Sequence, residues 1–316
     1  MGADGGELTG KVSVNGSSTV APISMAAAEM FQSKQPKVQI TVGISGTGGG
    51  FKKFLDDRAD LRIDICDASR AIEASEIERA KKLGIEFVEL PIALDGMAVV
   101  VHPGNSFCND LTVAELKRIW EPGSTINNWK DIRPGFPDLP LKLYGPGTDS
   151  GTFDYFTAAV VGKEKACRSD YTGSENDNVL VQGVSGDKGS LGYFGFAYYD
   201  ANKAKLKLLA VAHGAEKPVL PSLETIRTGV YTPLSRPLFI YINKASLSRP
   251  EVKAFAEFYL ENAPAIVQLP GVHYVPLSDE LYNLAKQRVA KGTSGSAFEG
   301  VSSSGPRNLL ELYRGK

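Results

Sequence analysis

Three short stretches of the chain combine small hydroxyl residues with glycine where a loop should lead into a helix. They are residues 15–22, 45–50 and 148–152. The first turn of a helix has backbone N–H groups without partners inside the helix and carries the positive end of the helix dipole. Neighbouring Ser and Thr hydroxyls add further donors. The three stretches together favour a site for a desolvated anion, although each one alone is more often an ordinary N-cap.

An arginine and an acidic residue accompany these stretches. Arg70 follows Asp67-Ala-Ser at the expected end of a strand, where its guanidinium could bind two anion oxygens at once; an exposed arginine is the alternative. Asp149 would repel an anion unless that anion carries a proton to donate, as phosphate does and sulfate does not. An N-cap or an ion pair with Arg70 is the other role open to Asp149. Asp67 is a second candidate acceptor, with turn capping as its alternative.

Length and charge limit the class of protein. The chain has 316 residues, more than one typical domain, and 42% of them are hydrophobic, enough for a proper core. Because 35 basic residues face 36 acidic ones, we expect no nucleic-acid or membrane-surface partner held by bulk charge. No apolar run approaches the roughly 20 residues of a membrane span. The start of the chain lacks the basic and apolar sections of a signal peptide but resembles the loose leader of a trimmed mature chain, so export stays open.

The cysteines lack the close spacing of zinc or redox sites, and we expect neither a metal nor a cofactor. Cys66 lies in an apolar run and is expected to be a small buried residue. Cys108 and Cys167 lie in polar, loop-like surroundings, which suggests a disulfide between them as a hypothesis.

Strand and helix patterns alternate along the first third of the chain, as in a parallel sheet with crossover helices. The expected strands are residues 11–14, 38–44 and 63–67, and the expected helices are 21–35, 50–58 and 76–83. Two extended apolar segments follow, 86–92 and 96–101. We place a crossing between domains near 93–96.

The rest of the chain repeats the strand, loop and helix order. A capping box at Thr112 begins a helix that ends at Trp120. A strand over 141–145 leads into the third hydroxyl stretch. The other expected elements are a helix over 150–161, a strand over 238–242, a helix from a capping box at 248–251 to residue 262, a helix over 278–291, and a Gly- and Ser-rich loop over 292–306 before a short terminal helix.

Enzymatic readings find little support. The chain has no P-loop, no complete Gly-x-Gly-x-x-Gly motif and no Gly-x-Ser-x-Gly elbow. His102, His213 and His273 lie in unremarkable settings, and no pair of them has metal-ligand spacing. The sequence therefore predicts no enzyme and no catalytic residue.

Nearly the whole chain resembles the periplasmic phosphate-binding proteins of ABC phosphate transporters, which have the type II solute-binding fold. The residues that carry this resemblance are 16–22, 46–53, 64–70, 90–101 and 144–153. The resemblance implies an α/β fold of two lobes, each a mixed sheet flanked by helices, with phosphate held between them by helix N-termini and hydroxyls. We expect lobe 1 to comprise 8–93 and 236–316, lobe 2 to comprise 94–235, and two hinge crossings to lie near 92–96 and 233–238.

The resemblance also implies a set of ligands. These are Ser18, Thr19, Thr47, Ser150, Gly151 and Thr152, and the chemistry of the residues themselves adds Gly48, Arg70 and Asp149 to the predicted phosphate-binding set. Two of these depart from the best-known family pattern. Many members have an acceptor Asp where this chain has Arg70, and an Arg in the second lobe where this chain reads 146–152 without one. The cation would thus move to Arg70 and the acceptor to Asp149.

The predicted function is to bind inorganic phosphate between the lobes and deliver it to the transmembrane subunits of an ABC permease. The resemblance implies a monomer outside the cytoplasm, in the periplasm or its equivalent. A receptor for another oxyanion, sulfate or molybdate, is the alternative, and a phosphate-ester hydrolase that reuses the same cradle is the more remote one.

Overall fold

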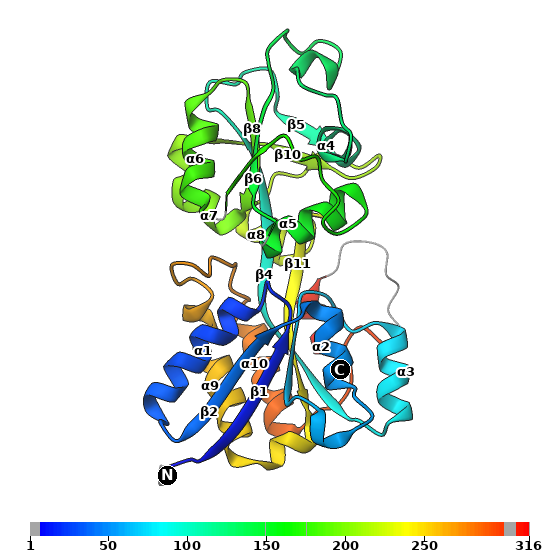
Figure 1. Ribbon diagram of the computed structural model, residues 1–316, viewed down its shortest axis with the longest axis vertical. Coiled ribbons are helices and arrows are strands. Elements are labelled where there is room, and N and C mark those ends of the chain that lie inside the picture. Colours follow the sequence, from blue (N-terminus) through cyan, green and yellow to red (C-terminus); the bar gives the residue numbers. More distant parts are fainter. Residues whose placement is uncertain (1–6, 149, 175, 300–307, 316) are drawn as a thin grey trace. The chain divides into compact units, whose positions relative to one another are not determined.

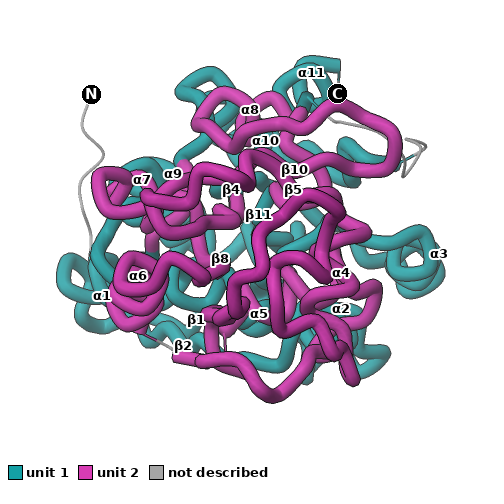
Figure 2. Tube along the Cα trace, turned by 90° about the horizontal axis from the view of Figure 1, so that it is seen from above, with its two compact units in different colours: residues 1–94, 237–272, 276–316 teal, residues 95–236, 273–275 magenta. Residues whose placement is uncertain are grey.

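The chain forms two compact units. The computed structural model describes residues 7–148, 150–174, 176–299 and 308–315. Unit 1 contains residues 1–94, 237–272 and 276–316, and unit 2 contains 95–236 and 273–275 (Figure 2). The chain passes between them within two strands, β4 (Phe87–Val101) and β11 (Ser235–Asn243), and again on either side of the short segment 273–275.

Unit 1 has a mixed sheet in the order β2-β1-β3-β11-β4. β1 (Gly10–Gly16) pairs in parallel with β2 (Val38–Ile44) on one side and β3 (Ile65–Ala68) on the other. β11 runs antiparallel to β3. The carboxyl ends of β1, β2 and β3 therefore meet at one edge of the sheet, where ligands commonly bind in α/β folds.

Helices flank this sheet (Figure 1). They are α1 (Ala21–Lys34), α2 (Gly46–Phe54), α3 (Ala74–Lys82), α9 (Pro250–Ile266), α10 (Asp279–Lys291) and α11 (Leu309–Arg314), with the short 3-10 helices η1 (Ala59–Leu61) and η5 (Lys244–Ser248). The ring of Phe31 on α1 meets Phe255 and Phe258 of α9 edge to face, at centroid distances of 5.5 and 5.3 Å. These apolar contacts fix α1, and so the turn that precedes it.

In unit 2 the strands pair in the order β4-β8-β6-β7, with β9 also on β4, and they belong to the same nine-stranded sheet. β6 is parallel to β7 and β8, whereas β4 is antiparallel to β8. The strands are β6 (Lys142–Pro146), β7 (Thr172–Ser174), β8 (Ser190–Gly195) and β9 (Lys207–Leu208), and a separate pair joins β5 (Asp110–Thr112) to β10 (Ala210–Ala212).

The helices of unit 2 surround an aromatic core. They are α4 (Val113–Trp120), α5 (Gly151–Phe156), the π-helical turn η3 (Thr157–Val161), α6 (Asp177–Gly186), α7 (Phe196–Asn202) and α8 (Leu223–Arg227), with the 3-10 helices η2 (Trp129–Asp131) and η4 (Lys203–Lys205). Phe156 stacks on Tyr193 at 3.6 Å, and Trp120 meets both rings edge to face. This packing fixes the carboxyl end of α5.

Several expected elements are confirmed. The strand over 38–44 and the helix that begins at Ala21 occur as predicted, and the capping box of Thr112 with Glu115 forms at the start of α4. Each unit is a mixed sheet with helices, as the predicted α/β class requires.

Other expectations are wrong. α2 begins at Gly46 rather than at residue 50, so the second hydroxyl stretch forms its first turn. The segments 86–92 and 96–101 are one continuous strand. The capping box at 248–251 does not form, because the Ser248 hydroxyl donates to the Ala245 carbonyl.

The hypothesised disulfide between Cys108 and Cys167 is also wrong: both thiols are free, as is Cys66. Cys66 is fully buried, as expected. Within the described residues, no helix is both long and apolar enough to cross a membrane.

Candidate functional site

The first hydroxyl stretch forms the turn between β1 and α1. The Ser17 amide donates to the Asp67 carbonyl at 2.9 Å, so the turn is tied to the end of β3. Gly16 makes this approach feasible, because it has φ +148° and a Cβ there would lie 2.1 Å from the Asp67 oxygen. Ser18 and Thr19 thus lie directly before α1, at the carboxyl edge of the parallel strands.

The second stretch lies at the same edge. Thr47 and Gly48 are in the first turn of α2, and a side chain at Gly48 would meet open space. Gly50 lets α2 approach the strand ends, since a Cβ at this position would lie 2.7 Å from Gly16 Cα and 2.9 Å from the Cys66 sulfur. Unit 1 therefore brings the first two predicted stretches to one end of its sheet.

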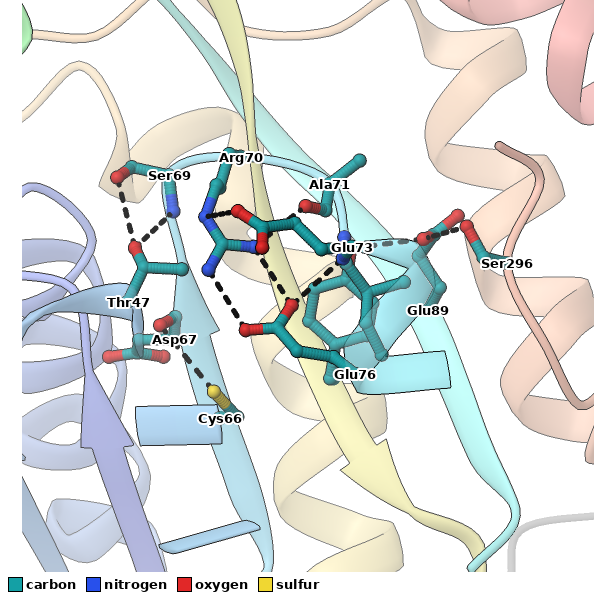
Figure 3. A network of polar contacts seen from close by, with 12 residues as sticks. Thr47, Cys66, Asp67, Ser69, Arg70, Ala71, Glu73, Glu76, Glu89 and Ser296 are labelled. Atoms are coloured by element: carbon teal, nitrogen blue, oxygen red, sulfur yellow. Dashed lines mark hydrogen bonds and ion pairs between the residues drawn. The ribbon is translucent and has the colours of Figure 1, made fainter. Parts of the chain in front are cut away.

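Thr47 is held by the loop that follows β3. Its Oγ1 accepts a hydrogen bond from the Ser69 amide at 3.1 Å and lies 3.1 Å from the Ser69 hydroxyl. Figure 3 shows this contact beside the next residue, Arg70. The loop over 69–72 thus decides where the Thr47 hydroxyl lies.

Arg70 is engaged by two carboxylates of its own unit. Its Nη1 and Nη2 each donate to Glu76 at 2.9 Å, its Nε lies 3.3 Å from Glu73, and its guanidinium lies 5.5 Å from the Phe51 ring centroid (Figure 3). Burial acts to lower the pKa of Arg70, but the hydrogen bond and charge of Glu76 raise it further than burial lowers it. To bind an anion with this fork, Arg70 would have to exchange Glu76. Its role as a ligand stays a prediction.

Asp67, the second candidate acceptor, is fully buried. Its Oδ1 accepts from the Ser24 hydroxyl of α1 at 2.9 Å, and Ser24 lies 3.0 Å from the Tyr259 hydroxyl. Among the residues that the structure describes, none donates to Oδ2. Burial raises the pKa of Asp67 to about 7, although the Ser24 hydrogen bond acts against this. The carboxyl therefore lies behind α1 rather than on an open surface.

The third stretch begins a helix in unit 2, as predicted. Ser150 is the N-cap of α5, and its Oγ accepts from the Thr152 amide at 3.2 Å. Gly151 is the first helical residue, and the stretch follows directly on β6. Asp149, the predicted acceptor, lies outside the described residues.

Sequence reasoning missed a cation next to this stretch. Arg236 has Nε and Nη2 at 3.3 and 3.2 Å from Asp95 Oδ2, and Nη2 also lies 3.4 Å from the Gly151 carbonyl. Its guanidinium carbon lies 3.8 Å from the Tyr155 ring centroid, a cation–π contact. The signal that could have found it is the presence of two opposite charges, Asp95 and Arg236, at the two expected hinge crossings.

The Asp95 side chain is 1% exposed and that of Arg236 is 17% exposed. Burial raises the pKa of Asp95, and the Arg236 charge and hydrogen bond oppose the shift. A buried carboxylate with a cation beside it remains charged more readily than one without. Arg236 is therefore held against the first turn of α5.

No cluster of three or more His, Cys, Asp or Glu side chains suited to a metal ion occurs in the described parts of the chain. The donors near the three stretches are hydroxyls, amides and guanidinium groups. Such donors suit an anion rather than a cation.

Comparisons with known proteins agree with this chemistry. A family model described as the PBP superfamily domain matches residues 3–263. Protein SphX of Synechococcus elongatus is 46% identical over 92% of this chain and 85% of its own length, and the phosphate-binding protein PstS of Staphylococcus saprophyticus is 36% identical over 88% and 84%. The crystal structure of a possible phosphate binding protein from Planctomyces limnophilus has a TM-score of 0.85 and 47% identity, covering 90% of this chain and 99% of that one. The chain belongs to the PBP superfamily, among the relatives of Protein SphX and of the phosphate-binding proteins PstS.

Proposed function

We propose that this protein is the receptor that binds inorganic phosphate outside the cytoplasm and delivers it to an ABC permease. One observation carries the proposal: in a chain 36% identical to a phosphate-binding protein PstS, three hydroxyl- and glycine-containing turns each lie at the carboxyl end of a strand and lead into a helix. It is a transport receptor and not an enzyme. We propose that it acts as a monomer and has no nucleic-acid partner.

The proposed ligands are hydroxyls and amides of these turns. Unit 1 would contribute Ser18, Thr19, Thr47 and Gly48, and unit 2 would contribute Ser150, Gly151 and Thr152. An oxyanion with four oxygens needs many donors and little water, because each donor left unsatisfied costs free energy. Binding of one ion by both units stays a prediction.

For the cation, we favour Arg236 over Arg70. The carboxylates of Glu73 and Glu76 surround Arg70, so the local charge there is negative. Arg236 pairs with the buried Asp95 carboxylate and lies against the Gly151 carbonyl, within the third hydroxyl stretch. It would supply the positive charge that residues 146–152 lack.

Selection of phosphate over sulfate requires an acceptor for the phosphate proton. Asp149 remains the proposed acceptor, since Asp67 is enclosed behind α1. Phosphate has five heavy atoms, so a ceiling of about −1.5 kcal/mol per atom gives about −7.5 kcal/mol, a dissociation constant of a few micromolar.

Titration calorimetry tests the proposal directly. We expect phosphate to bind with a dissociation constant of a few micromolar, and sulfate or molybdate at millimolar concentration not to compete. Competition by either ion would favour the alternative receptor. Turnover of a chromogenic phosphate ester would favour the hydrolase.

A further inference from the structure

Glu89, near the start of β4 and far along the chain from the hydroxyl stretches, is a fully buried carboxylate. Its Oε2 accepts from the Tyr241 hydroxyl at 2.9 Å and from the Ser296 hydroxyl at 2.6 Å. Its Oε1 accepts from the Ala297 amide at 2.9 Å and from the Tyr313 hydroxyl at 2.8 Å. These donors come from β11, from the segment after α10 and from α11, so Glu89 anchors the carboxyl-terminal part of the chain on β4. Figure 3 shows its contact with Ser296.

Tyr241 extends this anchor to the loop after β3. Its hydroxyl donates to Glu89 and accepts from the Ile72 amide at 2.9 Å. Donation to a carboxylate oxygen polarises the hydroxyl oxygen and makes it a better acceptor. The Tyr241 ring is fixed by edge-to-face contact with Phe51 of α2, at 5.0 Å. The Ile72 amide is therefore held at a defined place.

The loop from Ser69 to Ile72 links this amide to Thr47. At one end the loop is tied to Tyr241, and at the other its Ser69 amide and hydroxyl contact the Thr47 hydroxyl, both at 3.1 Å. A loop held at both ends has few alternative conformations, so loosening one end changes the geometry at the other.

We infer that Glu89 and Tyr241 are positioning residues for phosphate binding: through the Ile72 amide they fix the loop that orients Thr47, and the carboxyl-terminal segment completes the anchor. The inference rests on the proposed function, because it takes Thr47 as a phosphate ligand. Neither Glu89 nor Tyr241 touches phosphate itself.

Tyr241→Phe is the decisive variant, because it removes the hydroxyl and keeps the ring. We expect phosphate binding, measured by calorimetry, to weaken about tenfold. Tyr282→Phe is the matched control: Tyr282 is equally buried, and its hydroxyl donates to the Ile92 carbonyl of the same strand. We expect Tyr282→Phe to leave the affinity within twofold of the wild type.

A double-mutant cycle with Thr47→Ala separates positioning from a general loss of stability. If Tyr241 acts through Thr47, then Tyr241→Phe should change the affinity less than twofold once Thr47 is alanine. The inference would be overturned if the losses in phosphate affinity caused by Tyr241→Phe and Thr47→Ala multiply in the double variant. It would also be overturned if Tyr241→Phe and Tyr282→Phe bind phosphate equally well. If Tyr241→Phe does not fold, the same cycle is made with Ser296→Ala. We expect Ser296→Ala to weaken phosphate binding threefold in the chain that keeps Thr47, and not to weaken it in the Thr47→Ala variant.

Phosphate binding by the wild type separates a failure of the proposed function from a failure of this inference. A wild type that does not bind phosphate would overturn the proposed function and this inference together. A wild type that binds phosphate while Tyr241→Phe and Ser296→Ala match it would overturn this inference alone.

Discussion

The two units differ in the partners of their buried aspartate and of the arginine near it. Each has a buried aspartate and an arginine near the turns predicted to bind an anion. In unit 2, Asp95 and Arg236 pair directly. In unit 1, Asp67 is hydrogen-bonded to a hydroxyl, while Arg70 pairs with the glutamates of α3.

The difference has consequences for charge. A buried carboxylate beside a cation stays ionised more readily, whereas burial without a cation beside it favours the protonated form. Asp67, with a pKa of about 7, belongs to the second class. Unit 2 thus has a neutral pair with its cation next to α5, and unit 1 has a titratable carboxyl behind α1.

The largest expected effect is on the stability of unit 2. Arg236→Met removes the ion-pair partner of the buried Asp95 carboxylate and should lower the free energy of unfolding by about 3–5 kcal/mol. Urea unfolding followed by circular dichroism measures this. Adding Asp95→Asn should recover most of the loss, and a double variant no more stable than the single one would show that the pair is not the cause.

A stability effect of similar size is expected in unit 1, but it depends on pH. Because the folded state raises the pKa of Asp67 to about 7, its protonated form is favoured there. Its stabilising contribution is therefore full below about pH 4 and is lost as the pH rises to about 7, by up to about 4 kcal/mol. Unfolding of the wild type and Asp67→Asn over this range should show a flatter profile for the variant.

The binding comparison tests which arginine serves the anion. The Arg236→Met/Asp95→Asn variant, which leaves no unpaired buried carboxylate at this pair, should bind phosphate about 100-fold more weakly, because a charge-assisted hydrogen bond is lost. Arg70→Met should lose less than about fivefold. If calorimetry shows that Arg70→Met loses tenfold or more in phosphate affinity, then Arg70 in unit 1 is the arginine that binds the anion, as the sequence suggested.

The smallest effect is expected at a helix cap. Ser150→Ala and Ser222→Ala each remove an N-cap hydroxyl in unit 2 and should each lower stability by about 1 kcal/mol. Only the first is expected to weaken phosphate binding, about fivefold, since Ser222 caps α8 and is no predicted ligand. Equal affinities for the two variants would remove Ser150 from the ligand set.

The fold could be predicted where local pattern and packing agree. The alternating residues of β2 and the helix spacing of α1 are examples. The start of α2 could not be predicted, because a glycine-rich run has poor helix propensity. The close packing of Gly50 on Gly16 overrides this propensity. The continuity of β4 was hidden in the same way, since Gly96 reads as a break but is required by contact with Ile226.

The candidate site could be predicted only in part. Hydroxyl and glycine runs before helices are visible in the sequence, so the three turns were found. Arg236 was not, because it lies 85 residues from Gly151 and meets it only through the pairing of the strands. Conversely, Arg70 looked available because its partners Glu73 and Glu76 become neighbours only when α3 forms.

The place of β11 has a consequence for biosynthesis. This strand lies between β3 and β4, although it is made after the other strands that the structure describes. As the chain emerges, unit 1 lacks the centre of its sheet until residue 243 is available, whereas the strands of unit 2 lack only the first two residues of β11 once Ala212 has emerged. Since domains tend to fold as they emerge, the inserted unit should reach its native state first, and the unit that begins the polypeptide should finish last.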